Sequence, residues 1–371
     1  MPPRSYRLRL AHDSKGRKDD MNGYVFFTNA IALGLSGPDS TWNDVDLSAL
    51  VPVGTKTAIL MGYDTTNIYQ YGFRHPDSVE DIGIIGQPAL YQFNLCRLSD
   101  DRHLDAYCNT VAAIPVYLIG YSDTDYILTD LVHNLPSCTV FEARDVSAVV
   151  PAAASGVLVR MRCTSSASYY DTGIQAVGAA DNSTISIGPR NGSDIFAKLN
   201  SSRVFEFLWE SSTAYQDAWT RGYFMDEAVF FDEPQAATLG AINDYRLIDL
   251  SAIIPDGAKG IMYRVKYTSV GSYTQWAARH PDSTDNFKRY SQGKAFGYCG
   301  VNAAREIDFY RNNANLSMDI LGYFTTPTPS VVPWPNPKKG FVDAYQCFLS
   351  NYIRAKVEGF EPLKLPDGTV F

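Results

Sequence analysis

An eleven-residue element occurs three times in the chain and limits what the chain can fold into. It reads WNDVDLSALVP at residues 42–52, FEARDVSAVVP at 141–151 and YRLIDLSAIIP at 245–255. Aromatic and aliphatic runs precede it, starting at residues 24, 126 and 228, so the spacing is 102 residues both times. This regular spacing predicts a tandem triplication of a unit of about 100 residues, long enough for each copy to have its own core.

Strand-like stretches follow each copy of the element, at residues 57–63, 156–163 and 260–267. Apolar residues alternate with Arg160 and Arg162 in the second stretch, and with Arg264 and Lys266 in the third. A period of two indicates strands with one face on a core and the other in water. Near the end of each copy we expect a hairpin, formed by residues 103–108 and 114–121, by 203–210 and 215–224, and by 305–311 and 316–324.

These patterns predict an all-β chain of three tandem antiparallel β-sandwich or jelly-roll domains. The expected boundaries are a basic N-terminal arm (1–21), repeats at 22–121, 122–223 and 224–324, and a proline-rich linker with a C-terminal amphipathic helix (325–371). The linkers at 122–125 and 224–227 are too short to act as flexible spacers. The domains must therefore pack against each other or form a stiff rod.

The shared element itself has a structural interpretation. Asp46 and Ser48, and their counterparts in the other copies, can accept hydrogen bonds from following backbone amides and so start a tight turn. The proline that ends each copy prevents continuation of the turn and lets the chain enter a strand. Each copy also closes on a Gly-Tyr pair, at 120–121, 222–223 and 322–323, which we expect to anchor the last strand.

The pentapeptide RHPDS occurs at residues 74–78 and 279–283, while the middle copy has Gln175 where arginine is expected. One interpretation is a turn beside a surface arginine that pairs with Asp105 or Asp308. The other is a contact site that faces a ligand or a neighbouring subunit. That site would consist of Arg74, His75, Asp77, Arg279, His280 and Asp282. Because the middle copy lacks it, replacing either arginine with alanine should cost no more than about 1 kcal/mol.

Both ends of the chain are candidates for contacts with other molecules. The first twenty residues are basic although the whole chain has a net charge of −8, so they either contact an acidic neighbour or remain solvated. Near the other end, four aromatic residues recur at helical spacing and predict an apolar stripe that packs on its own domain or on another subunit. They are Phe341, Tyr345, Phe348 and Tyr352.

Composition and motif searches limit the functional classes. The acidic net charge argues against a general nucleic-acid binder, and no apolar run is long enough for a membrane span or a signal peptide. We therefore expect synthesis in a cytoplasm. The six cysteines form no CxxC pair, which favours free, buried thiols. We find no motif for a catalytic centre, metal or cofactor and expect a protein that is not an enzyme, although a carboxylate pair of the glycosidase kind needs no sequence motif.

Three tandem β-domains with a basic arm and a tethered helix resemble the virion structural proteins of tailed phages, such as capsid-decoration, fibre and tail proteins. The resemblance is one of architecture and implies a virion component, made in the host cytoplasm, that binds other copies of itself and other virion proteins. A carbohydrate-binding array that contacts a surface glycan is the alternative, and exposure of Trp42, Tyr71 and Trp276 would favour it. A glycan-active enzyme is the third possibility.

Overall fold

A computed structural model describes the greater part of the first 326 residues. The described ranges are 23–33, 41–63, 70–79, 84–85, 91–108, 115–124, 127–136, 138–163, 170–180, 184–187, 192–209, 216–267, 274–291 and 294–326. The chain divides into two compact units, Met1–Pro327 and Thr328–Phe371, and every described residue belongs to the first. The expected N-terminal arm and C-terminal helix lie outside the described residues.

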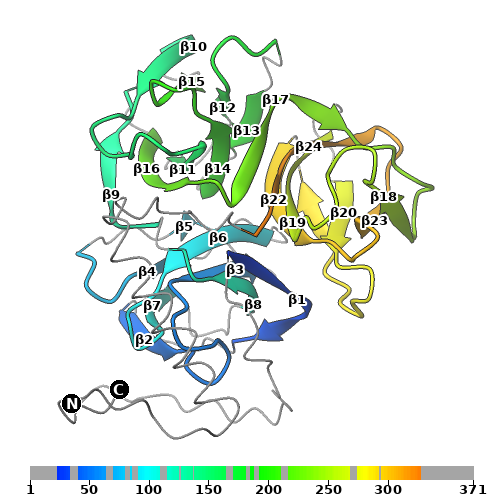
Figure 1. Ribbon diagram of the computed structural model, residues 1–371, viewed down its shortest axis with the longest axis horizontal. Helices are drawn as coiled ribbons and strands as arrows, with labels where there is room; N and C mark the ends of the chain where they lie inside the picture. Colours follow the sequence, from blue (N-terminus) through cyan, green and yellow to red (C-terminus); the bar gives the residue numbers. More distant parts are fainter. Residues whose placement is uncertain are drawn as a thin grey trace, which may run out of the picture. The chain divides into compact units, whose positions relative to one another are not determined.

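Within the described ranges each repeat supplies eight strands, which can be followed by colour in Figure 1. Repeat 1 consists of β1 (Tyr24–Ala32), β2 (Trp42–Asp46), β3 (Thr57–Tyr63), β4 (Gln70–Arg74), β5 (Ile84–Ile85), β6 (Tyr91–Arg97), β7 (His103–Cys108) and β8 (Val116–Ser122). Repeat 2 consists of β9 (Ile127–Asn134), β10 (Cys138–Asp145), β11 (Gly156–Cys163), β12 (Tyr170–Gln175), β13 (Thr184–Ile187), β14 (Gly192–Lys198), β15 (Val204–Trp209) and β16 (Gln216–Phe224). Repeat 3 consists of β17 (Ala228–Ala236), β18 (Tyr245–Asp249), β19 (Gly260–Tyr267), β20 (Thr274–Arg279), β21 (Arg289–Ser291), β22 (Lys294–Gly300), β23 (Glu306–Arg311) and β24 (Leu316–Phe324).

The strands of every repeat form two four-stranded antiparallel sheets. In repeat 1 the orders are β1-β8-β3-β6 and β2-β7-β4-β5, and repeats 2 and 3 have the same orders with equivalent strands. Eight strands divided in this way between two sheets form a jelly roll. The prediction of an all-β chain with three tandem sandwich or jelly-roll units is confirmed, and β3, β11 and β19 occupy equivalent places, as expected.

The predicted hairpins are wrong, although their strands are present. β23 pairs with β18 and β20, whereas β24 pairs with β17 and β19 in the other sheet. The same holds for β7 and β8, and for β15 and β16. Two such strands, although consecutive in the chain, therefore belong to different sheets. An alternating pattern with a turn identifies two neighbouring strands but does not determine which sheet each joins.

The shared eleven-residue element forms the expected tight turn in all three copies. The amides of Ser48, Ser147 and Ser251 donate to the carboxylates of the aspartates two positions earlier, at 2.7–2.8 Å. An arginine from a later loop completes each turn by donating to two of its carbonyl oxygens. These arginines are Arg102, Arg203 and Arg305, and all three have positive φ angles of 62–67°. Such a backbone is strained for residues other than glycine, so the repeated arginine offsets the strain with two hydrogen bonds.

The expectation that one face of each alternating strand lies in water is also wrong. In β19 the side chains of both faces are buried, and Met262 and Arg264 have exposed fractions of 0% and 2%. The second face packs against the neighbouring repeats instead of solvent. The arginines on this face of β11 and β19 are paired with carboxylates, Arg160 with Asp194 and Arg264 with Asp319. This pairing reduces the cost of burying their charge.

The three repeats contact one another in a cycle of equivalent joints. β6 of repeat 1 contacts β9 of repeat 2, β14 of repeat 2 contacts β17 of repeat 3, and β22 of repeat 3 contacts β1 of repeat 1. We name these contacts joint 1–2, joint 2–3 and joint 3–1. The strands β6, β14 and β22 also contact each other. The repeats therefore pack against each other, as the short linkers predicted, and the alternative of a stiff rod is excluded.

Aromatic rings fill the region where the three repeats meet. Phe196 of repeat 2 stacks on Tyr298 of repeat 3, with ring centroids 5.1 Å apart, and Phe93 of repeat 1 lies 5.8 Å from the same tyrosine. Phe324 contacts Tyr24 at 4.3 Å and Phe224 at 6.3 Å. Each fully buried ring contributes about 1.5–3 kcal/mol, so the joints are stabilised as a core is. The core of repeat 2 is continuous with this cluster, while repeats 1 and 3 also have cores of their own.

The cysteines are free and buried wherever the structure describes them. They are Cys96, Cys108, Cys138, Cys163 and Cys299. Burial raises the pKa of the Cys96 thiol to about 12, which keeps it protonated and unreactive. The prediction of free thiols is confirmed for these five, and Cys347 lies outside the described residues.

Candidate functional site

The two RHPDS segments form closely similar turns at the ends of β4 and β20. The amide of Asp77 donates to Nδ1 of His75 at 3.1 Å, and the amide of Ser78 donates to the His75 carbonyl at 2.9 Å. The corresponding distances around His280 are 3.2 and 2.9 Å. Each histidine thus organises its own loop, and its Nδ1 acts as an acceptor. The proline in the middle favours the turn because it fixes φ.

The arginine of each segment pairs with a carboxylate on the neighbouring strand and covers an aromatic ring. Arg74 donates to Asp105 at 3.2 Å and lies 4.2 Å from the centroid of the Trp42 ring. Arg279 donates to Asp308 from Nε and Nη2, at 3.2 and 3.0 Å, and lies 3.7 Å above Tyr245. Burial raises the pKa of Asp105, and the hydrogen bond from Arg74 opposes this shift. Both carboxylates named from the sequence are therefore the partners.

Repeat 2 keeps the position of this pair but not its charge. Gln175 lies opposite Glu206 in the register of β12 and β15, as Arg74 lies opposite Asp105 and Arg279 opposite Asp308. Its Nε2 donates to Glu206 Oε2 at 2.7 Å. The same nitrogen also donates to the carbonyl of Ala179 at 3.2 Å. A neutral amide therefore replaces the arginine of the ion pair, and the repeat folds without the pentapeptide.

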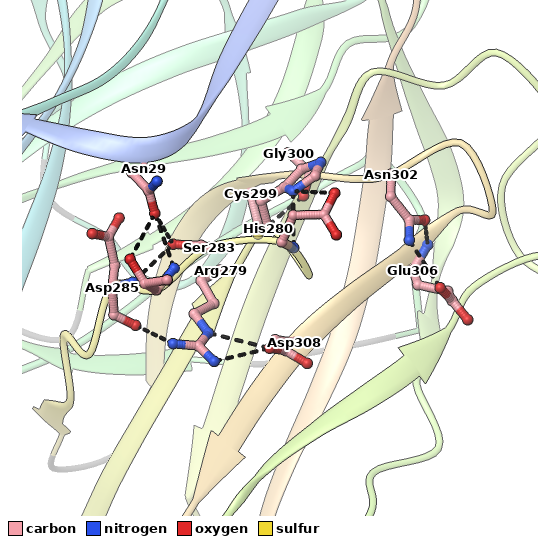
Figure 2. A network of polar contacts seen from close by, with 12 residues as sticks. Asn29, Arg279, His280, Ser283, Asp285, Cys299, Gly300, Asn302, Glu306 and Asp308 are labelled. Atoms are coloured by element: carbon pink, nitrogen blue, oxygen red, sulfur yellow. Dashed lines mark hydrogen bonds and ion pairs between the residues drawn. The ribbon is translucent and has the colours of Figure 1, made fainter. Parts of the chain in front are cut away.

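The RHPDS loop of repeat 3 is part of joint 3–1. Oδ1 of Asn29, on β1, accepts hydrogen bonds from the Thr284 amide at 2.9 Å and from the Ser283 hydroxyl at 3.2 Å. The amide of Ala30 donates to the carboxylate of Asp285 at 2.7 Å. Figure 2 shows Arg279 between Asp308 and Asp285, whose backbone carbonyl accepts a hydrogen bond from Nη1. The arginine thus supports a loop that binds another repeat.

The corresponding loop of repeat 2 makes the same kind of contact at joint 2–3. The amide of Ala180 donates to Oε1 of Glu233 on β17, at 3.1 Å. Glu233 and Asn29 are 204 residues apart, which is twice the repeat spacing, so both loops bind the same position of the next repeat. The side chains of Asp77 and Asp282 remain 87% and 76% exposed. A contact of these loops with a ligand or another subunit stays a prediction, and these two carboxylates are accessible for it.

The same hollow recurs at two of the joints. At joint 3–1 it measures about 510 Å³ and at joint 2–3 about 410 Å³, including space open to solvent. Equivalent aromatic residues line both: Phe26 and Phe230, Phe93 and Phe296, and Tyr298 and Phe196. The polar lining differs, with Arg279 and His280 in the first and Gln175 and Arg264 in the second. The hollows at these two joints therefore have equivalent aromatic linings and differ in their polar and charged side chains.

Joint 1–2 contains a buried cluster of charges that the sequence analysis missed. Arg160 donates to both carboxylate oxygens of Asp194, at 2.8 and 3.0 Å, and to Asn94 Oδ1 of repeat 1 at 2.8 Å. Arg221 lies 3.6 Å from Asp194 and donates to the carbonyls of Leu95 and Phe73 in repeat 1. All three charged side chains are at most 4% exposed. Because Arg160 alternates with apolar residues, it had been interpreted as facing water.

A repeated β-bulge directs Arg221 toward repeat 1. The register between β11 and β16 skips this residue, since Leu158 faces Gly222 and Val159 faces Thr220. Equivalent skips occur at residue 119 in β8 and at residue 321 in β24. A bulge adds one residue and reorients its side chain. The Gly-Tyr pair that closes each repeat therefore marks a bulge beside a joint.

The remaining structural checks concern metals, membranes and sugars. Among the described residues, no cluster of three His, Cys, Asp or Glu side chains could hold a metal ion. No helix in these ranges is long and apolar enough to cross a bilayer. Tyr71 and Trp276 are each 1% exposed, and Arg74 covers the ring of Trp42. Tyr71 and Trp276 therefore offer no ring to a sugar.

Comparison with known proteins gives weak structural likeness and no family. No protein-family model and no curated protein matches the sequence. Among solved structures, a chain from the X-ray structure of the entire lipid-containing bacteriophage PM2 is similar over 80% of this chain and 86% of that chain. The identity is 11% and the TM-score is 0.16.

Four aromatic residues were expected to form an inter-subunit arm. They lie outside the described residues: Phe341, Tyr345, Phe348 and Tyr352.

The geometry predicts that the two RHPDS arginines differ in importance. The cost of about 1 kcal/mol expected from the sequence is kept for Arg74→Ala. For Arg279→Ala the structure raises the expected cost to about 2–3 kcal/mol, because Arg279 also holds the loop that binds Asn29 and Ala30. Urea denaturation of both variants would measure the difference. Equal losses would mean that the docked loop adds nothing to the ion pair.

Proposed function

We propose that the protein is a structural subunit of a virus particle, in which one polypeptide supplies three jelly rolls and acts through protein–protein contacts. The observation that carries this proposal is the closed cycle of equivalent joints. Head-to-tail contacts between identical units close into rings when the rotation permits it. Here the units are linked covalently, so a single chain has the contacts of a cyclic trimer.

Such a block suits a particle because it presents similar outer sheets three times. The edge strands β2, β10 and β18 occupy equivalent places in these sheets. On two of them a large apolar side chain is exposed, Val140 at 60% and Leu247 at 58%. Exposed edges with apolar side chains can pair with further copies. Buried joints with exposed, repeated edges are what an assembly subunit requires.

The segment at residues 328–371, which lies outside the described residues, supplies a test of this function. We propose that its apolar residues bind neighbouring subunits, since the cores of the described repeats contain the strands that they need. Deletion of 328–371 should leave a folded monomer that no longer forms large assemblies. Light scattering and electron microscopy of both proteins over a range of concentrations would measure this.

Two outcomes would contradict different parts of the proposal. If the shortened protein assembled as the full chain does, residues 328–371 would not be the contact, although the subunit function would stand. If the full chain remained a monomer at all concentrations and did not join assemblies of other virion proteins, the structural function itself would be wrong. An unfolded shortened protein would assign the segment to the stability of the three repeats.

A further inference from the structure

The turn that links repeats 2 and 3 brings three parts of the chain together. Its amide at Ala228 donates to the Met225 carbonyl at 3.1 Å. The hydroxyl of Ser155 lies 2.6 Å from the Met225 carbonyl oxygen and 2.8 Å from that of Ala228. The backbone carbonyl of Glu227 accepts a hydrogen bond from Thr325 at 2.8 Å. The turn therefore fixes the start of β11, the start of β17 and the residue that follows β24.

The side chain of Glu227 is buried in this turn with incomplete hydrogen bonding. The residue is 0% exposed, and one carboxyl oxygen, Oε1, accepts a hydrogen bond from the Met225 amide at 3.2 Å. The other, Oε2, has no hydrogen-bond partner among the described residues. A buried carboxylate with one oxygen left without a hydrogen bond is costly, whereas the neutral acid costs much less.

The neighbouring charges oppose ionisation further. Burial is the largest effect and raises the pKa of Glu227 from 4.5 to about 7. Hydrogen bonds from the backbone amides of Glu227 and Met225 oppose this shift, whereas the carboxylates of Asp226 and Asp123 add to it. Asp226 belongs to the same turn, and Asp123 follows β8 and accepts a hydrogen bond from the amide of Gly23. The other two elements at the turn contribute the uncharged Ser155 and Thr325. The charges that act on Glu227 are thus both negative.

We propose that the protonation state of Glu227 controls opening of the turn that links repeats 2 and 3, so that this link is sensitive to pH. With the carboxyl neutral, the turn holds β17 and the residue after β24 in place. When the carboxyl ionises, its buried charge favours opening of the turn and loosens the point where the chain leaves repeat 3. The proposal concerns the joint itself and does not depend on the particle in which the protein acts.

The direction of the pH effect follows from proton linkage. Because the folded state binds the proton more tightly than the unfolded chain, the contribution of the neutral acid is complete below about pH 4.5. It is lost as the pH rises through about 7. The two pKa values differ enough to change the opening equilibrium on the order of 100-fold. The joint should therefore be tighter in mild acid than in mild alkali.

Amide hydrogen exchange can measure this opening directly. The reporters are the amides of Met225, Ala228 and Thr325, with exchange corrected for the intrinsic effect of pH on the rate. Their protection should fall on the order of 100-fold between about pH 5 and about pH 9 in the wild type, and stay constant in Glu227→Gln. The amide of Lys56, which donates to Ser122 at the other linker, is the internal control and should not change.

A second variant keeps the proposal testable if Glu227→Gln does not fold. Asp226→Asn removes one of the two repelling charges, so it should move the midpoint of the pH transition to a lower value without abolishing the transition. A wild type whose three reporters show no transition would overturn the proposal. The proposal would also be wrong if the transition persisted in Glu227→Gln, or if Asp226→Asn did not change the pH of its midpoint.

Discussion

Replacing Asp194 with asparagine is expected to lower the free energy of unfolding by about 3–5 kcal/mol. The variant keeps the size of the side chain, but its amide nitrogen cannot accept one of the two hydrogen bonds from Arg160, and the negative charge that faces Arg160 and Arg221 is lost. Both guanidinium groups are buried, with at most 4% exposure, so solvent cannot replace the lost charge. Removing one partner of a buried ion pair is strongly destabilising, because the other charge remains in a medium of low polarity.

A matched control lies on the neighbouring pair of strands, β11 and β16. Asp217 pairs with Arg162 at 2.6 Å, but the two side chains are 31% and 26% exposed. Replacing Asp217 with asparagine should therefore cost less than about 1 kcal/mol, as is usual for an exposed pair. Urea denaturation would give both values. Similar losses for the two variants would mean that the cluster at joint 1–2 is hydrated, contrary to its burial.

Replacing Gly322 with alanine is the second change with a large expected effect, a loss of about 3 kcal/mol or more. An added Cβ would lie 2.2 Å from the carbonyl oxygen of Val229 on the paired strand and 3.0 Å from the Cα of Phe230. Both contacts are with backbone atoms, so no side chain can rotate away. The two strands would have to separate at the bulge, next to the rings of the central cluster.

Gly257 in the same repeat provides the control for this substitution. It has a positive φ of 83°, and an added Cβ would meet no atom within 4 Å. Alanine at this position should cost about 1–2 kcal/mol through backbone strain alone. Thermal unfolding of the two variants would separate steric from conformational effects. A loss at Gly322 no larger than that at Gly257 would show that the bulge adapts without cost.

The sequence predicted the repeated parts of this fold well because repetition makes a local pattern visible. The alternation in residues 156–163 and 260–267 identified equivalent strands, and the three copies of the eleven-residue element identified a turn. The neighbours of each strand were harder to infer. Alternation shows that the two faces of a strand carry different side chains, but it does not show whether water or another repeat lies against each face. Arg160 and Arg264 were placed in water for this reason, while they pair with carboxylates in the interior.

The candidate site was predicted only in part. The partners of Arg74 and Arg279 could be named, since a carboxylate recurs at one position of the strand that follows three strands later in the chain. The docking of the third loop on Asn29 could not, because it joins residues about 255 apart in sequence. One missed signal was available: Arg102, Arg203 and Arg305 recur at intervals of 101 and 102 residues. Aligning the copies residue by residue would have identified them as a shared structural feature.

Covalent linkage of the three repeats allows each joint to differ from the others. In a trimer of three separate, identical chains, any substitution at the interface appears three times. A buried cluster with two arginines and one aspartate would then place three excess positive charges around a common centre. In this chain the cluster occurs at joint 1–2, and the aspartate position of β14 is occupied by Phe93 in β6 and Phe296 in β22. Covalent linkage thus permits single, asymmetric charges that a symmetric assembly would have to multiply.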